Sequence, residues 1–185
     1  AGWTAALYAL AVLEKFPAEV FRRGWAALGT GEALNFEQLH SISVVLRICE
    51  YKMPSVIQCS PALRDRAMQA ASTARQGKMT GTHEHTSVLQ MLQTMGIRCE
   101  AEGGGSEIEA DVYLPDHKVA VEVDGEHHFT HLLNPNGRTH ARNLILESQG
   151  VRVVAIPLFE WQRQSIPDRR RYLASKLAAA GVSVR

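Results

Sequence analysis

The chain has 185 residues, of which 45% are hydrophobic and 21% charged, with a formal net charge of +1. This composition excludes a disordered chain, a collagen and a coiled coil, and the length suits one large domain or two small ones. No apolar run approaches the ~18 to 20 residues of a membrane span, and the three cysteines form no CxxC pair. We therefore expect no membrane partner and a reducing compartment.

Charge is divided unevenly along the chain. Residues 1 to 98 contain 10 Lys and Arg against 7 Asp and Glu, whereas residues 99 to 185 contain 10 against 12. Neither half is a strongly basic nucleic-acid footprint. A nucleic acid would have to be held by a few local cations, with help from protein neighbours.

The first part of the sequence is patterned as a series of short helices. Pro17 and Asn35 lie where two of them should begin. Apolar residues recur at the three- and four-residue spacing of an amphipathic helix in residues 7–13, 20–28 and 39–49. Sliding the sequence by 35 places superposes Leu7 on Ile42 and Leu28 on Leu63, which is typical of stacked helical hairpins. We interpret residues 1 to 81 as helical hairpin repeats at the end of an α-solenoid.

From Thr82 onward, helices and strands alternate. A helix ending at Gly96 precedes a short strand at residues 97–101 and a glycine-rich hairpin tip at residues 103–105. The runs IEADVYL and KVAVEVD then form a hairpin, followed by a helix through Arg142, the buried strand VRVVAIP and a last helix at residues 167–180. This order predicts an α/β domain over residues 84 to 185, and an α+β chain overall.

Three carboxylates lie on the predicted hairpin. Asp111 is within one strand, and Glu122 and Asp124 on its partner share a face because side chains alternate along a strand. Converging carboxylates are the oxygen ligands that Mg²⁺ prefers. The alternative is that these acids cap loops or pair with arginines such as Arg138 and Arg142.

Two histidines, His127 and His128, follow this cluster directly, and imidazoles can move protons or hold phosphates. Close carboxylates should favour their protonated form. His83 and His85 have i, i+2 spacing, which does not suit metal ligands on a helix, so we expect them to start a helix. His131 and His140 are expected in loops or at the surface.

Three sequence strings and the polar residues between the first two of them resemble a RAP domain, a family named for its abundance in apicomplexan RNA-binding proteins. The strings are VAVEVDGEHHF, LESQGVRVVAIPLFEW and YLASKL. The polar residues that carry this resemblance are Asn134, Gly137, Arg138, Thr139 and Arg142. The resemblance covers residues 84 to 180. It implies a fold similar to restriction-endonuclease-like nucleases, placed after helical repeats as in octotricopeptide, heptatricopeptide and FAST-kinase-like proteins.

The resemblance also implies a function in organellar RNA processing or stability, or as a component of a mitochondrial ribosome or another ribonucleoprotein. The expected partners are RNA and neighbouring proteins, with no small-molecule substrate. The expected location is the mitochondrion, with the plastid as alternative. Seven residues are expected to contact RNA: His127, His128, Arg138, Arg142, Arg169, Arg170 and Arg171.

Catalysis is the second hypothesis. In restriction-type nucleases the second acidic strand reads acid, any residue, lysine, whereas here the lysine position is Asp124. The resemblance therefore implies that Asp111 and Glu122 are at metal-binding positions. The positive charge of the usual lysine is missing, unless His127, His128 or Arg138 replaces it. We expect no efficient hydrolysis and no cofactor. The alternative is a Mg²⁺-dependent endoribonuclease that uses Asp111, Glu122, Asp124, His127 and His128.

Two further features have two interpretations each. The arginine run at residues 169–171 could grip phosphates, because arginine presents a planar fork of donors, or it could be the solvated face of a helix. Trp161 could stack on an unpaired base or belong to the core. Trp3 and Trp25 lie on apolar helical faces, which favours the core.

Overall fold

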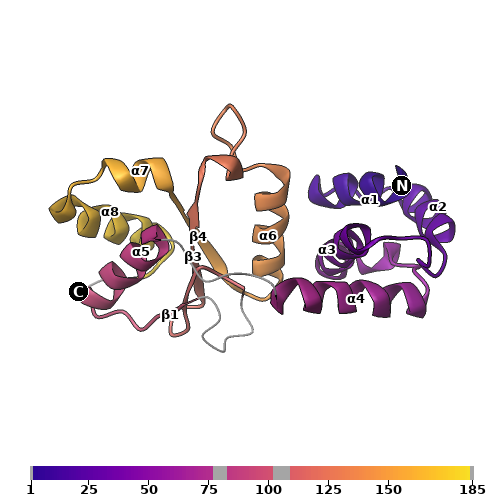
Figure 1. The fold of residues 1–185 in the computed structure, drawn as a ribbon, viewed down its shortest axis with the longest axis horizontal. Helices are drawn as coiled ribbons and strands as arrows, with labels where there is room; N and C mark the ends of the chain where they lie inside the picture. The colour runs from indigo at the N-terminus through magenta and orange to yellow at the C-terminus, as the bar shows by residue number, and fades with distance from the viewer. Residues whose placement is uncertain (1, 77–82, 102–108, 184–185) are drawn as a thin grey trace. The chain divides into compact units, whose positions relative to one another are not determined.

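The computed structural model describes residues 2–76, 83–101 and 109–183 (Figure 1). The chain divides into two compact units, Ala1–Lys78 and Met79–Arg185. The first is helical and the second combines helices with a sheet, so the α+β class predicted from the sequence is confirmed. No helix within the described ranges is long and apolar enough to pass through a bilayer. The predicted glycine-rich tip at residues 103–105 lies outside these ranges.

Local sequence signals define the helix starts of the first unit. Its described elements are α1 (Gly2–Val12), α2 (Ala18–Leu28), α3 (Phe36–Lys52), the 3-10 turn η1 (Pro54–Val56) and α4 (Pro61–Gln76). The predicted starts after Pro17 and Asn35 are confirmed. Asn35 Oδ1 accepts a hydrogen bond from the Gln38 backbone N–H at 2.9 Å, and Gln38 Oε1 accepts one from the Asn35 N–H at 3.0 Å. This reciprocal pair satisfies two N–H groups that the helix itself leaves without partners.

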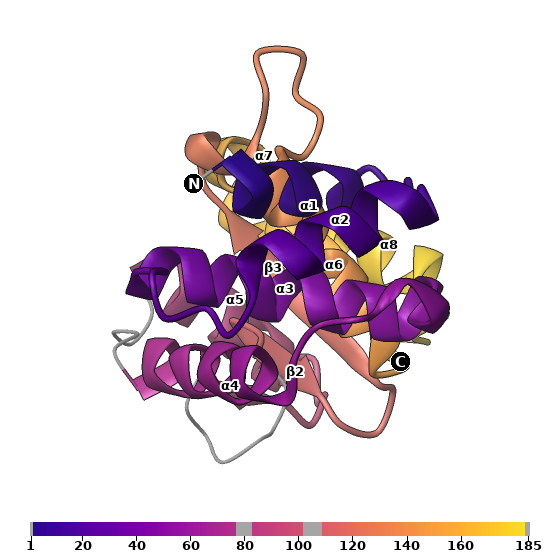
Figure 2. The ribbon, with the colours of Figure 1, turned by 90° about the vertical axis from the view of Figure 1, so that its right-hand side faces the viewer.

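The core of the first unit lies around α3, which packs against both α1 and α4 (Figure 2). Gly24 permits the close approach of α2 to α1, because a Cβ there would lie 2.9 Å from Leu7 Cδ2. The indole of Trp25 is buried, as predicted, and its Nε1 donates a hydrogen bond to the Val56 carbonyl at 2.7 Å. Trp3 is only half-buried.

The 35-residue similarity holds for the first helix of each hairpin only. Leu7 in α1 and Ile42 in α3 are both fully buried. Under the same shift, α2 would correspond to residues 53–63, but those residues form η1, a loop and only the first turn of α4. The second hairpin is therefore built with a longer connection, and the solenoid assignment stays a prediction.

The second unit is built on a mixed sheet. Its described elements are α5 (His83–Thr94), β1 (Glu100–Ala101), β2 (Val112–Leu114), β3 (Val119–Asp124), the 3-10 turn η2 (Glu126–His128), α6 (Gly137–Ser148), β4 (Arg152–Pro157), α7 (Leu158–Arg163) and α8 (Ile166–Ala179). The strand order is β1-β2-β3-β4, with β2 antiparallel and β4 parallel to β3. The predicted hairpin is confirmed, but β2 begins only at Val112, so Asp111 lies in a bend before the strand.

The two faces of this sheet have different coverings. Val119, Val121 and Val123 point into the main core with residues of α5, α7 and α8, including the buried Trp161. Ala120 points the other way and packs with Leu146 of α6. Figure 1 shows α6 on one side of the sheet and α5, α7 and α8 on the other. Because side chains alternate along a strand, Glu122 and Asp124 lie on the α6 face with Ala120.

Candidate functional site

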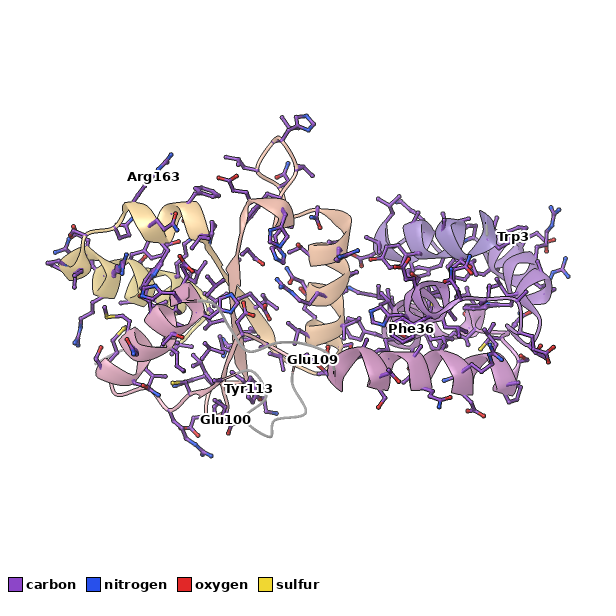
Figure 3. The ribbon with its side chains drawn as sticks, viewed as in Figure 1. Trp3, Phe36, Glu100, Glu109, Tyr113 and Arg163 are labelled. Carbon is purple, nitrogen blue, oxygen red and sulfur yellow. The ribbon has the colours of Figure 1, made fainter. Side chains whose placement is uncertain are left out.

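The carboxylates of Glu122 and Asp124 are buried at the C-terminal end of β3, each only 1% exposed. Period-two alternation directs both toward α6, and the side chains of the second unit fill the space between the sheet and its helices (Figure 3). A buried carboxylate is strongly disfavoured unless a cation or several hydrogen bonds compensate its charge. The surroundings of these two groups therefore decide what the site can do.

Arg142, on the second turn of α6, compensates both carboxylates. Its Nη1 lies 2.8 Å from Glu122 Oε2, and its Nη2 donates a hydrogen bond to Asp124 Oδ1 at 3.0 Å. Burial acts to lower the pKa of Arg142, but the two carboxylates outweigh burial and raise that pKa above its ordinary value. The guanidinium is therefore a permanent cation between the two acids, as in the second interpretation of the acidic cluster.

Asp111 reaches the same strand end from the bend before β2. Its Oδ2 accepts a hydrogen bond from the backbone N–H of Val123 at 2.7 Å, and His85 Nε2 lies 3.6 Å from the same oxygen. The structure therefore brings the three predicted carboxylates to one place but gives each a protein partner. His83, as predicted, begins α5.

His128 lies against the acidic cluster, and its pKa is lowered from the ordinary value of a histidine. Its Nδ1 is 3.3 Å from Asp124 Oδ1 and 3.2 Å from Thr139 Oγ1. Burial lowers the pKa of His128, the positive charges of His127 and Arg142 lower it further, and Asp124 offsets this only in part. Asp124 and Asp111 thus favour the protonated form, as expected, but burial outweighs them and leaves the pKa of His128 below its ordinary value.

Asn136 organises the exposed edge of the site, and the sequence reasoning missed it. Its Oδ1 accepts hydrogen bonds from the backbone N–H groups of Arg138 and Thr139, both at 3.0 Å, which caps α6. Its Nδ2 donates a hydrogen bond to the His127 carbonyl at 2.6 Å. An asparagine directly before the helical pattern was the available signal.

Asn136 thus joins the segment of His127 to the start of α6, and we call this contact the Asn136 junction. The side chains of His127 and Arg138, one on each of the two joined segments, are exposed. The ring of His127 stacks on that of His128 with centroids 4.2 Å apart. Gly125 lies beneath the His127 ring, since a Cβ there would be 3.1 Å from its Nδ1. The Arg138 guanidinium has no hydrogen-bond or ion-pair partner within the described residues. Both side chains are therefore accessible to an anionic ligand.

The arginine run at residues 169–171 lies on α8, across the sheet from α6, and its members differ in environment. Arg169 stacks over Trp161, its Cζ 5.0 Å from the ring centroid, and donates a hydrogen bond to Ser87 Oγ at 3.3 Å. Arg171 is paired with Asp168 at 2.8 Å, and Arg170 is exposed. The run is thus separate from the acidic cluster.

Trp161 has the core position that one of its two interpretations predicted. Its indole is 1% exposed and packs within the main apolar cluster of the second unit. A base cannot reach its ring in this conformation. Of the remaining histidines, His131 is exposed in the loop between η2 and α6, whereas His140 lies within α6. Arg163 projects into solvent from α7 (Figure 3).

The acidic cluster in this arrangement does not fit a metal ion. No group of three His, Cys, Asp or Glu side chains within the described ranges has metal-site geometry. More directly, the Arg142 guanidinium already lies between the Glu122 and Asp124 oxygens that a divalent ion would need. The donor set is that of an ion-pair network.

Comparison with known proteins agrees with this domain architecture. The RAP domain family model matches residues 121–176. This segment contains the parallel strands β3 and β4 and follows the helical region of the chain. The C-terminal part of the chain carries a RAP domain. RAP domains are generally associated with RNA binding. A comparison of the sequence with curated proteins gives no match.

Proposed function

We propose that this protein binds RNA in an organelle, the mitochondrion with the plastid as alternative, and acts in RNA processing or stability or as a component of a ribonucleoprotein. The RAP domain at residues 121–176 supports RNA as the ligand. The observation that carries the proposal is the pair of exposed side chains, His127 and Arg138, held on either side of the Asn136 junction.

Charge supports contacts to RNA that are few and local. Residues 99–185 have two more acidic than basic residues, and two of the acids are already paired with Arg142. A protein that neutralises many phosphates usually gains most of its affinity from released counterions. This domain has few cations to offer, which favours shared binding with protein neighbours such as those of a ribosome.

Its mixed sheet, with α6 crossing between parallel strands, is compatible with a restriction-endonuclease-like arrangement.

We expect Arg138→Ala to weaken RNA binding without changing the stability of the protein. The full chain is titrated into a fluorescein-labelled single-stranded RNA, and anisotropy is followed at several salt concentrations. Loss of one phosphate contact should make the slope of log affinity against log salt shallower by about 0.7. His127→Ala should also weaken binding.

The matched control is Arg98→Ala, which removes the same charge from an exposed arginine near the opposite end of β3. Arg98 makes two surface ion pairs among the described residues, at 3.3 Å to Asp116 and 3.8 Å to Glu100. Affinity and slope should be unchanged in this variant. Equal losses in Arg98→Ala and Arg138→Ala would indicate non-specific attraction and would reject the assigned site.

A metal-dependent endoribonuclease is the second candidate, favoured by the convergence of Asp111, Glu122 and Asp124 beside His128. Because Arg142 lies between two of these acids, we expect no cleavage when the chain is incubated with single-stranded RNA and Mg²⁺ or Mn²⁺. Metal-dependent cleavage that both Asp111→Ala and Glu122→Ala abolish would establish the nuclease instead.

A further inference from the structure

At the end of β3, the carboxylates of Glu122 and Asp124 surround a cation, and this cation is a side chain of the protein itself. The two carboxylates lie on one face of β3, and the facing helix α6 inserts a single guanidinium between them. Each terminal nitrogen of Arg142 contacts a different carboxylate, so one cation serves both acids. The guanidinium fork suits this task because its donors are fixed in one plane.

Burial makes a cation at this place necessary. Glu122 and Asp124 are each 99% removed from solvent, and two uncompensated buried carboxylates would strongly destabilise the domain. Asp124 Oδ2 also has no hydrogen-bond partner within the described residues. That oxygen is a buried acceptor beside the Arg142 contact, and it could serve as a ligand if the guanidinium were removed.

We infer that Arg142 is the resident cation of this acidic strand end, in the place where a divalent ion would otherwise bind, and that removing its guanidinium opens an oxygen site for Mg²⁺ formed by Glu122 and Asp124. Hard divalent cations take carboxylate oxygens and complete their shells with water. Because Arg142 is held at the site by α6, it compensates the charge of the two carboxylates without an ion from solution. Cation binding at this strand end requires no RNA.

The test compares thermal unfolding of the full chain with and without MgCl2 for the wild type, Arg142→Met and Arg142→Lys. Methionine keeps an unbranched apolar stem but lacks the guanidinium and its charge. If the opened site binds Mg²⁺ with a dissociation constant of about 1 mM, about 10 mM Mg²⁺ multiplies the ratio of folded to unfolded protein roughly tenfold. We expect that gain in Arg142→Met only, and its loss when Glu122→Gln and Asp124→Asn are added. A Mg²⁺ effect of equal size in the wild type, or none in a folded Arg142→Met protein, would overturn the inference.

A second measurement covers the case in which Arg142→Met does not fold. Mn²⁺ broadens the amide NMR signals of residues near its binding site, so it is titrated into the ¹⁵N-labelled wild type. We expect no selective broadening at residues 121–125, because the guanidinium is in place. Selective broadening there would show that a divalent ion binds beside Arg142, and the inference would be wrong.

Discussion

Arg142→Ala is expected to destabilise the RAP-domain unit by about 3–5 kcal/mol, the usual cost of breaking a buried ion pair by removing one partner. The substitution leaves Glu122 and Asp124 buried, at 1% exposure each, with no cation between them. The loss is a large part of the ~5–15 kcal/mol by which a domain is usually stable. Hydrogen exchange of the protected amides of β3 measures it, because these amides report opening of the sheet independently of the helical unit.

The control for this prediction is Arg138→Ala, four residues earlier on the same helix. Arg138 is exposed and has no ion-pair partner within the described residues, so its removal should change stability by less than about 0.5 kcal/mol. A loss below about 1 kcal/mol for Arg142→Ala would contradict the ion-pair role. It would mean that the two carboxylates reach solvent or take up protons when the guanidinium is absent.

Trp161→Ala is expected to destabilise the same unit by about 3–5 kcal/mol, because it empties a large buried volume in the main core. The indole is 1% exposed, lies beneath the Arg169 guanidinium and stands 6.2 Å from the Tyr172 ring, centroid to centroid. Hydrogen exchange of β3 amides is again the measurement. RNA affinity, measured by anisotropy on the folded protein, should not change.

Trp161→Phe is the matched control. The Trp161 Nε1 has no hydrogen-bond partner within the described residues, so phenylalanine gives up bulk without breaking a hydrogen bond. We expect a cost below about 1.5 kcal/mol, as for a moderate change of volume in a core. If Trp161→Ala instead lowered RNA affinity with little change in stability, the base-stacking interpretation would be correct.

Local patterns were sufficient for the elements whose signals lie close together in sequence. The cap at Asn35, the hairpin of residues 112–121 and the start of α5 at His83 depend on neighbouring residues, and each was predicted. Alternation along β3 was also enough to place Glu122 and Asp124 on one face, because the period of a strand is a property of the backbone. The RAP motif string located the domain that the family comparison finds at residues 121–176.

The sequence by itself thus determined the order of elements, the shared face of the two acids and the family of the C-terminal domain. Only the tertiary structure decided which cation meets those acids. Arg142 is 18 residues from Asp124, and it reaches that carboxylate because α6 crosses back over one face of the sheet. The Asp111 contact with the Val123 N–H, the burial of Trp161 and the lowered pKa of His128 likewise depend on packing between distant segments. Residue spacing does not specify such contacts, because they form only when whole elements are placed against one another.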